Sequence, residues 1–532
     1  MKRLPCLIMS IVFATFLTAC SKEETSSDST SEPTSSTEPE NDSLAQNVSS
    51  YVDEDGNTVI IFGPSYVPPT FEEVQAEYPD KTVLVWAMQY MGAVPVEEIN
   101  KYLDDNGYDL AVCFKPIHVD YENYRRFPDA CVEDTKELLD SGEQIDIISP
   151  MNYEDYVFGG MYEPLDDYFE TDLGKKLYGI MPTGHWESLR INGRIYGVHG
   201  PSGYTLTPDW GYFVNAGLAE KYGFDVSKPI DEQIDILKKV KQNEPGCDIF
   251  SMSLSRTQIP ILNVGLKEIS IGAVSVYWND ETHSAECAFD NAEYLQRLRL
   301  YDALKGEGLF KNDRYSTSKN NFFIMQENIE GAGTVYNTSD RVTVNYNGNE
   351  IEAIPVYDSP TYIRKCGVAT GVCSYSDSKE KAFRLLALTQ TDAYLNNLLS
   401  FGIEGEDYEL ENGAIKEVSV DYSFNKLYFA NHMICLPYEE FWFTPEQYEE
   451  IYANAGTFGD SGFVVDLAPI AAELNVTEPV FDDLYFRTQK DGVELSFEET
   501  ISALRKRLED AGIQKIIDEC NRQYEVYKNE NN

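Results

Sequence analysis

The amino-acid sequence predicts an α/β protein of two lobes, each a mixed sheet flanked by helices, joined by a multi-strand hinge. Two observations lead to this prediction. The chain has 532 residues, and a hydrophobic core of that size usually divides between domains. Apolar runs and amphipathic stretches also alternate along residues 82–148, which is the order of a parallel sheet with right-handed crossover helices.

The first sheet is predicted from three short apolar runs, which are typical of buried parallel strands. After the first run, Val96, Ile99 and Leu103 recur at helical spacing, and Gly107 follows as a helix C-cap. The expected elements are a hairpin at 53–62, strands at 82–87, 110–115 and 145–148, and a second helix at 131–139. Ligands of such open sheets bind beyond the carboxyl ends of the strands.

The C-terminal residues predict two helices. Ser496 and Glu499 have the spacing of a capping box, and Gly512 ends the first helix. Each helix has an apolar stripe that we assign to core packing and not to ligand contact. The stripes consist of Ile501, Leu504, Leu508 and Ala511, and of Ile513, Ile516, Ile517, Cys520 and Tyr524.

The N-terminus has the pattern of an export signal. Lys2 and Arg3 precede an uncharged apolar run at 7–17, which is too short for a reliable membrane span. The run ends in Leu-Thr-Ala followed by Cys20, which resembles the lipobox of bacterial lipoproteins. That resemblance implies that residues 1–19 are a signal peptide and that Cys20 carries lipid, with enough acyl chains for stable anchoring.

The next segment suits an anchored protein. Residues 21–50 are rich in Ser, Thr, Glu and Pro and contain almost no large apolar residue before Leu44. Such a segment cannot bury enough apolar surface to offset its ordering entropy. We therefore expect residues 20–50 to be the lipidated Cys and a disordered tether, with the rest of the chain outside the cell.

Composition excludes some partners. The formal net charge is -48 and the sequence pI is about 4.3. Nucleic acids and anionic lipid surfaces require basic protein surface, so neither is expected as a direct partner. The acidity itself says little about a ligand, because it is most simply a solvated surface.

The cysteines leave the disulfide state open. They are scattered with no Cys-x-x-Cys pair, and several lie in apolar stretches that suit buried thiols, although an exported chain permits disulfides and Cys366 and Cys373 are near enough in sequence to pair. The cysteines beyond the anchor are Cys113, Cys131, Cys247, Cys287, Cys366, Cys373, Cys435 and Cys520.

Motifs of enzymes and metal sites are missing from the sequence. It has no Gly-x-Ser-x-Gly elbow, no P-loop and no Gly-x-Gly-x-x-Gly fingerprint. Its five histidines are isolated, and none has the i, i+4 spacing of a zinc site. With 90 acidic residues, a catalytic carboxylate pair cannot be recognised. We expect no catalytic residue, no metal and no cofactor.

Residues 145–200 carry a resemblance to a known family. They contain Asp-Ile-Ile at 146–148, Gly-Met-Tyr-Glu-Pro-Leu-Asp-Asp at 160–167, and Trp186 followed by Gly-Arg-Ile-Tyr-Gly-Val at 193–198. This order is similar to the extracellular solute-binding proteins of family 1, the sugar receptors of ABC importers. The family's Pro after the last strand is displaced here to Pro201.

Two later segments resemble a subgroup of large, lipid-anchored receptors within that family. Residues 401–408 read Phe-Gly-Ile-Glu-Gly-Glu-Asp-Tyr, with Asn-Gly at 412–413. Residues 511–519 read Ala-Gly-Ile-Gln-Lys-Ile-Ile-Asp-Glu, with Gln523 after them. The resemblance extends from about residue 82 to about residue 527.

The resemblance implies the type II periplasmic-binding-protein-like fold, whose chain crosses between lobes several times. We expect crossings near 198–204, 358–369 and 402–405, where Gly and Pro cluster. Lobe 1 would comprise 51–200 and 360–402, and lobe 2 would comprise 201–359 and 403–532.

It also implies a function. The chain would be the non-enzymatic receptor of an ABC importer, anchored by lipid on the extracellular face of the cell membrane. It would capture a carbohydrate, most simply an oligosaccharide, between the lobes and deliver it as a monomer to the permease. A receptor for peptides or acidic glycans is one alternative, and Arg364 near the cleft would favour an acidic ligand. An adhesion or sensory module and a carbohydrate-active enzyme are alternatives of other classes.

Sugars are bound by aromatic rings over their C–H patches and by polar groups at their hydroxyls. We therefore select polar and aromatic residues at loop positions, although most of the 13% aromatic residues must pack in the core. Trp86, Trp278 and Trp186 have neighbours typical of core. The predicted ligand contacts are Met88, Gln89, Tyr90, Asn152, Tyr153, Tyr204, Asp209, Trp210, Tyr212, Tyr336, Asn337 and Trp442.

Overall fold

The computed structural model describes residues 48–52, 58–62, 68–89, 93–117, 130–150, 152–201, 205–207, 210–252, 266–268, 275–279, 281–311, 321–328, 341–346, 349–356, 362–363, 365–419, 422, 425–438, 444–457, 462–486 and 496–531. The predicted signal peptide, Cys20 and most of the predicted tether lie outside these residues. The tether was predicted to extend to residue 50, but strand β1 (Val48–Val52) already begins at Val48 and pairs antiparallel with β2 (Thr58–Phe62).

The first sheet has five strands in the order β4-β3-β5-β20-β8. Three parallel strands occupy the apolar runs recognised in the sequence, and two strands from later in the chain pair antiparallel beside them. The predicted parallel sheet is thus confirmed and is one part of a mixed sheet. The strands are β3 (Thr82–Met88), β4 (Leu110–Pro116), β5 (Ile147–Ser149), β8 (Gly197–Val198) and β20 (Thr370–Val372).

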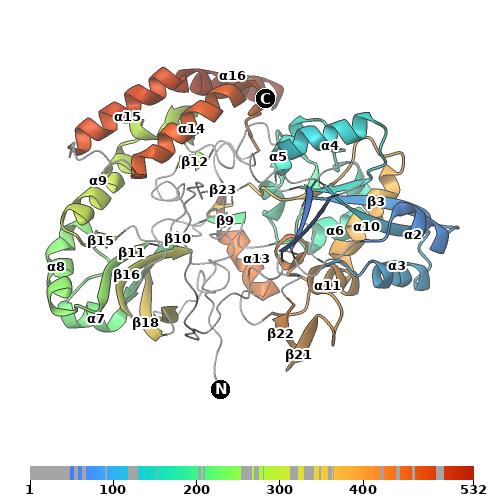
Figure 1. Ribbon diagram of the computed structural model, residues 1–532, viewed down its shortest axis with the longest axis horizontal. Helices are drawn as coiled ribbons and strands as arrows, with labels where there is room; N and C mark the ends of the chain where they lie inside the picture. The colour runs from blue at the N-terminus through green and yellow to red at the C-terminus, as the bar shows by residue number, and fades with distance from the viewer. Residues whose placement is uncertain are drawn as a thin grey trace, which may run out of the picture.

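Helices surround this sheet (Figure 1). They are α2 (Phe71–Glu77), α3 (Val96–Asp105), α4 (Ala130–Asp140), α5 (Tyr153–Phe158), α6 (Asp172–Ile180), α10 (Lys379–Thr391) and α11 (Ala393–Phe401). The two predicted helices of this region are confirmed as α3 and α4.

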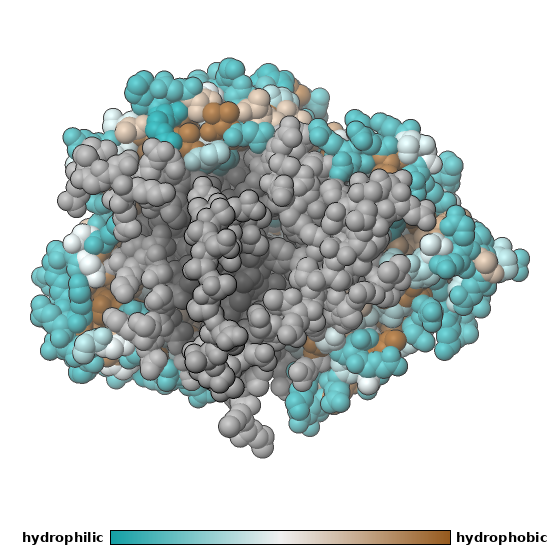
Figure 2. All heavy atoms as spheres, viewed as in Figure 1, coloured by the Kyte–Doolittle hydropathy of each residue, from teal (hydrophilic) through white to brown (hydrophobic). Residues whose placement is uncertain are grey.

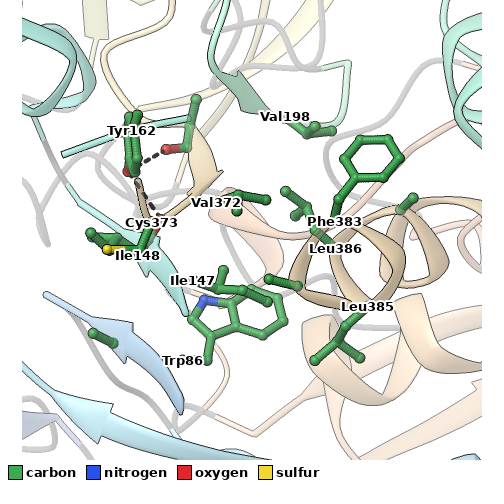
Figure 3. Close-up of a cluster of buried hydrophobic side chains, with 14 of the residues drawn as sticks. Trp86, Ile147, Ile148, Tyr162, Val198, Val372, Cys373, Phe383, Leu385 and Leu386 are labelled. Carbon is green, nitrogen blue, oxygen red and sulfur yellow. Dashed lines mark hydrogen bonds between the residues drawn. The ribbon is translucent and has the colours of Figure 1, made fainter. Parts of the chain in front are cut away.

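The core of the first lobe is centred on Trp86 of β3. Its ring stacks on Phe114 at 5.4 Å and meets the edge of Phe429 at 5.9 Å. Figure 3 shows side chains from β3, β5 and α10 converging here. In the same close-up, the buried Tyr162 hydroxyl donates to the carbonyl oxygens of Ile148 and Ala369, at 3.0 and 3.2 Å. These two bonds tie β5 to the segment that enters β20.

The second sheet has six strands in the order β15-β11-β16-β10-β18-β17. Strand β11 is parallel to β15 and β16, and the other pairs are antiparallel, so this sheet is mixed as predicted. The strands are β10 (Trp210–Asn215), β11 (Cys247–Met252), β15 (Phe310–Lys311), β16 (Asn321–Asn328), β17 (Val342–Tyr346) and β18 (Asn349–Val356). Helices α7 (Ala216–Tyr222), α8 (Ile234–Asn243) and α9 (Ala292–Gly306) accompany it.

The C-terminal helices form a separate core with a small antiparallel sheet. Trp278, Phe463 and Tyr524 lie at its centre, with ring centroids 4.6–5.2 Å apart. The predicted capping box at Ser496 and the helix end at Gly512 are both present. The elements are β12 (Leu266–Glu268), β13 (Val276–Asn279), β14 (Ser284–Cys287), α14 (Ala471–Phe486), α15 (Phe497–Ala511) and α16 (Ile513–Asn531).

Three very short strands lie where the chain passes between the two large sheets. Strand β19 (Tyr362–Ile363) pairs antiparallel with β9 (Leu206–Thr207) and parallel with β23 (Gly456–Thr457). Helix α13 (Pro445–Asn454) packs beside them, and Leu206, Ile363 and Ile451 share one hydrophobic cluster. The label of β9 stands between the two lobes in Figure 1. We call β9, β19, β23 and α13 the hinge.

The sheet topology gives the path of the chain between the two large sheets. The chain leaves the first sheet after β8 and reaches β10 by way of β9, and it returns from β18 to β20 by way of β19. The third crossing passes through β23, not through 402–405. Gly402 instead caps α11, where its φ of +85° and its closeness to Asp407 admit only glycine.

Residues 403–438 consequently belong with the first lobe, although the sequence analysis assigned 403–532 to the second. The hairpin of β21 (Tyr408–Glu411) and β22 (Ala414–Val418) shares a cluster with Phe401 of α11. Helix α12 (Asn425–Tyr428) follows, and Phe429 joins the first core. The apolar side chains of this segment pack against Phe401 at the end of α11. The sequence alone does not reveal this packing.

The described surface is mostly hydrophilic on the face shown in Figure 2. Acidic residues of the described surface are paired with lysine and arginine at several places, for example Glu220 and Glu352 with Arg341. These exposed pairs are worth little individually, because water and salt screen them. They agree with the prediction that the acidity is a solvated surface.

Candidate functional site

A small pocket lies at the carboxyl end of β5, the edge at which open α/β sheets bind ligands. It is lined by Ser149, Pro150, Val368, Ala369, Thr370, Tyr428 and Phe429. Its volume is about 20 Å³, which is the room that about one water molecule needs. A larger ligand would therefore lie over this pocket and insert only one group into it.

The sheet topology brings the lining residues together. Strands β5 and β20 are antiparallel neighbours, with Ile148 opposite Gly371. The carboxyl end of β5 therefore meets the start of β20, and the hydroxyls of Ser149 and Thr370 lie 2.7 Å apart. The Trp86 Nε1–H donates to the Ser149 hydroxyl at 2.8 Å. The floor of the pocket thus has two hydroxyls held in fixed positions by the core.

Hydrogen bonds from two helices fix the backbone of the aromatic lining residues Tyr428 and Phe429. The carbonyl oxygen of Phe429 accepts hydrogen bonds from Gln390 Nε2 of α10 and Asn396 Nδ2 of α11, both at 3.0 Å. The Phe429 ring is buried against Trp86, whereas Tyr428 is half-buried. Two buried amides from different helices therefore fix the backbone that presents Tyr428 at the pocket.

The residues that line the pocket are uncharged. The lining consists of hydroxyls, aliphatic carbons and aromatic rings, with no ionisable carboxylate or amine among the seven residues. Such a surface suits a neutral ligand that has both hydroxyl groups and apolar C–H faces. Within the part of the chain that the structure describes, no group of histidine, cysteine and acidic side chains is arranged to hold a metal ion.

Gln89, Met88 and Asn152 lie near the pocket in sequence and in structure. The Gln89 N–H donates to the carbonyl of Ser149 at 3.0 Å, and the Gln89 side chain is buried. Met88 is fully buried, and its carbonyl accepts from the Ile117 N–H at 2.8 Å. Asn152 is the half-buried N-cap of α5. The backbone of Gln89 is thus bonded to the pocket residue Ser149, whereas Met88 belongs to the core.

Tyr153 and Tyr212 are core residues in this structure. The Tyr153 hydroxyl is buried, where it donates to the Leu189 carbonyl and accepts from the Tyr196 N–H, both at 3.0 Å. Tyr212 is buried in the second sheet, with its ring edge toward Phe250. Both aromatic rings pack instead of facing a ligand surface, because the flanking apolar residues bury the strand or helix that carries them.

The other predicted contacts are not described. Tyr90, Tyr204, Asp209, Tyr336, Asn337, Trp442 and also Arg364 lie outside the described residues, and of Trp210 only the backbone in β10 is described. None of the seven lining residues is among the predicted contacts; Ser149 and Pro150 lie just past the end of a predicted strand, and the other five are Val368, Ala369, Thr370, Tyr428 and Phe429. The signal for Val368 and Ala369 was their place at the end of the second predicted crossing, and Thr370 begins the short strand β20 that follows. Tyr428 and Phe429 had no signal in the sequence.

Seven of the eight cysteines beyond the predicted anchor form no disulfide in this structure. Cys113, Cys247, Cys287, Cys366, Cys373, Cys435 and Cys520 are free thiols. The conceivable Cys366–Cys373 pair is not formed, and the Cys366 thiol donates to the Val368 carbonyl at 2.9 Å. Burial raises the pKa of the Cys113 thiol to about 12, so this thiol stays protonated and packs as an apolar group.

The fold is that of the sugar-binding solute-binding proteins of ABC transporters, type II of the periplasmic-binding-protein-like class. One solved relative is the N-glycan transport solute binding protein (NgtS) from Streptococcus pneumoniae, with a TM-score of 0.61 and 18% identity over 84% of this chain and 99% of that one. Another is an HMO binding ABC-transporter associated solute binding protein from Bifidobacterium longum infantis ATCC 15697, with a TM-score of 0.55, 12% identity and coverage of 84% and 99%. The predicted fold class is confirmed.

Sequence comparisons agree with the resemblance. A carbohydrate ABC transporter substrate-binding protein of Streptococcus pneumoniae serotype 4 (strain ATCC BAA-334 / TIGR4) is 23% identical over 292 residues. That match spans 53% of this chain and 58% of the relative, which is less than two thirds of its length. Residues 461–529 match the family described as Domain of unknown function (DUF3502), which here comprises helices α14 to α16. These relatives are binding proteins of transporters.

No helix in the described ranges combines the length and apolar character that a membrane span requires.

Proposed function

We propose that this chain is the extracellular solute receptor of an ABC importer and that it binds an oligosaccharide. The observation that carries the proposal is the uncharged pocket of hydroxyls and aromatic rings at the carboxyl end of β5, in a fold shared with oligosaccharide-binding receptors. A sugar offers a matching set of groups, because it presents hydroxyls around flat C–H patches.

The ligand would lie across the pocket, with one pyranose face on Tyr428 and a hydroxyl toward Ser149 and Thr370. The second lobe would complete the site on closure, and Trp210, Tyr336, Asn337 and Trp442 remain our proposed contacts from the residues beyond the first sheet. Ligand sites are commonly built between domains, and a hinge of short strands permits the closure.

The lining favours a neutral glycan over an acidic one. Neither lysine nor arginine is among the seven described residues that line the pocket, whereas a carboxylate ligand would need a cationic partner once removed from water. A receptor for acidic glycans or peptides is therefore the second choice within this class.

The cellular setting is part of the proposal. The signal-like N-terminus and Cys20 support a lipid anchor on the extracellular face, and the shared fold supports a permease as the partner. We expect a monomer that carries out no catalysis. Mass spectrometry of the protein purified from membranes would detect the acyl chains on Cys20.

The binding experiment is calorimetry on the exported chain with oligosaccharides that related proteins bind. Relatives have been solved with Man1GlcNAc, with Man5GlcNAc and with kestose, so these three sugars form the first panel, followed by uronic-acid oligomers and short peptides. Heat from one glycan series, with the glycan recovered intact, is the expected result. Recovery of a cleaved glycan would establish an enzyme, and binding of peptides alone would overturn the sugar.

A variant pair tests the pocket itself. Tyr428→Ala should weaken binding of the identified glycan by at least tenfold, because stacking of a ring on a sugar is lost together with its buried area. Tyr375→Ala is the matched control, because Tyr375 is 49% exposed and does not line the pocket. Equal affinities in the two variants would remove the pocket from the binding site.

A further inference from the structure

Three of the five histidines are buried together beside the hinge. His185 lies in a short helical turn of the first lobe, His199 lies just after β8, and His432 lies after α12. Their side chains are 0%, 2% and 5% exposed. His185 and His199 are 14 residues apart, whereas His432 lies more than 200 residues later in the chain, so the meeting of all three is a product of the tertiary fold.

The hydrogen bonds of His185 place the proton of its neutral ring on Nε2. The Nε2–H donates to the carbonyl oxygen of His199 at 2.8 Å. In a neutral imidazole the other nitrogen is then an acceptor, and His185 Nδ1 faces the hydroxyl of Tyr452 at 3.4 Å. The same Tyr452 hydroxyl is hydrogen-bonded to the Thr205 hydroxyl, on the segment that enters β9.

A second histidine is bound to the same face of α13. His432 Nδ1 lies 2.6 Å from the hydroxyl of Tyr448. Tyr448 and Tyr452 are separated by four residues, so both point from one side of the helix. Helix α13 therefore links the first crossing, through Thr205, to two buried histidines of the first lobe.

The backbone is packed tightly around this cluster. A Cβ atom placed on Gly200 would meet the Ala430 carbonyl oxygen and would lie 2.8 Å from Asn431 Cα. A Cβ on Gly184 would lie 3.1 Å from Ile363 Cδ1 of β19. The backbone beside His199 thus packs directly on residues 430–431, and the backbone beside His185 packs on Ile363 of the hinge, so the histidines and the hinge share one closely packed region.

The buried surroundings of these histidines favour the neutral form of each ring over the charged form. Burial, with a smaller contribution from His199, lowers the pKa of His185 to about 3. Burial and then His199 lower the pKa of His432 well below its usual value of 6.5. The titratable groups facing them among the described residues are the other histidines and the phenols of Tyr448 and Tyr452, with no described carboxylate acting on either ring.

We propose that His185, His199 and His432, with Tyr448 and Tyr452 of α13, form a proton-sensitive latch on the hinge. In the neutral form the latch holds the crossing segments in the arrangement of this structure. A proton on any of these rings places a charge among buried groups, so proton uptake favours an arrangement in which the cluster opens to water. The hinge equilibrium would consequently shift as the medium falls below pH 6.5, the usual pKa of histidine.

The experiment measures the hinge without any ligand, so that it is independent of the proposed function. Small-angle X-ray scattering of the full exported chain at pH 7.5 and pH 5.0 reports the relative placement of the lobes, and circular dichroism shows that the chain remains folded. We expect a reversible change in radius of gyration between these pH values. An identical scattering profile at the two pH values would overturn the latch.

Variants assign the change to the cluster. In His185→Gln with His432→Asn, each amide nitrogen replaces the ring nitrogen that bonds in the structure, and neither side chain titrates. This double variant should lose most of the pH-dependent change. His283→Gln is the matched control, because His283 is an exposed histidine of a turn in the C-terminal core. A double variant that responds like the wild type would also overturn the proposal.

A milder variant covers the case in which the double variant does not fold. Tyr452→Phe keeps the ring and removes the hydroxyl that joins His185 to Thr205. These bonds stabilise only the neutral arrangement, so their loss favours the arrangement that is open to water. The pH at which the radius of gyration changes should therefore be higher than in the wild type. A transition at the wild-type pH would show that Tyr452 has no part in the latch and would contradict the proposal.

Discussion

Gly200 occupies the point where the first crossing touches the backbone of residues 430–431. A side chain there has no free space, because its neighbours are main-chain atoms that cannot rotate away. Gly200 therefore determines how closely the crossing approaches the segment that carries His432 and the pocket residue Tyr428. Its role is one of size, not of backbone conformation.

The substitution Gly200→Ala tests this contact. We expect a loss of about 1–3 kcal/mol in the free energy of unfolding, the usual cost of overpacking, measured by denaturant titration. Gly179→Ala in α6 is the control, because a Cβ at Gly179 meets no atom within 4 Å, and alanine favours a helix by up to about 1 kcal/mol. Equal stability of the two variants would show that the backbone at 430–431 yields easily.

His185 also predicts how stability depends on pH. Its pKa is about 3 in the arrangement of this structure and near 6.5 when unfolded, so between these values the unfolded chain binds a proton that this folded arrangement does not. The free energy of unfolding should therefore be greatest above pH 6.5 and fall with acidification, by up to about 1.4 kcal/mol per pH unit for one such histidine. Denaturant titrations of wild type and His185→Gln from pH 7.5 to 5 measure the slope, which should be smaller in the variant.

The hinge strands are the elements on which conformational change depends. Strands β9, β19 and β23 have two residues each, so few ladder hydrogen bonds resist a rotation between the lobes. The stiffness of the hinge must come from side chains, and α13 supplies them through its two tyrosines and Ile451. Short strands with a packed helix are thus suited to two arrangements, not to a continuous bend.

Helix α15 is an element whose start can be tested separately. The Ser496 hydroxyl accepts from the Glu499 N–H at 3.3 Å, and the Glu499 carboxylate accepts from the Ser496 N–H at 2.9 Å. Ser496→Ala removes half of this capping box and should lower the free energy of unfolding by about 1 kcal/mol. Ser502→Ala, at an exposed position in the same helix, should leave stability unchanged or raise it slightly. Hydrogen exchange of the α15 amides would locate the effect, and unchanged exchange in Ser496→Ala would contradict it.

The whole molecule carries an excess of negative charge. A formal net charge of -48 favours solubility but opposes compaction through mutual repulsion. Salt shortens the range of this repulsion to about 8 Å at physiological ionic strength.

We therefore expect the melting temperature to rise when sodium chloride is increased from about 10 mM to about 150 mM, the range over which screening becomes effective. Differential scanning calorimetry measures the shift, and sucrose at matched osmolarity controls for solute exclusion. A melting temperature that is constant or falls would mean that the exposed ion pairs outweigh the repulsion among unpaired acids.

Parts of the two large sheets and of the C-terminal core could be predicted from the sequence. The alternation of apolar runs and helical stripes determined β3, β4, β5, α3 and α15, because the periodicity of burial is a local property of the chain. The resemblance to family 1 receptors, which depends on the order of short motifs, correctly predicted the two-lobe fold.

The residues that line the pocket could be predicted only in part from local sequence patterns. Ser149 and Asn152 were in the predicted region because strand ends can be recognised locally, but Tyr428 reaches the pocket only because buried amides of α10 and α11 bind the backbone of Phe429. The buried positions of Tyr153 and Tyr212 were likewise decided by neighbours distant in sequence. By itself the sequence determined the fold class, the signal-like N-terminus and the first strands, since these depend on local pattern. Only the tertiary structure decided the third crossing, the histidine cluster and the pocket lining, because each depends on which distant segments pack together.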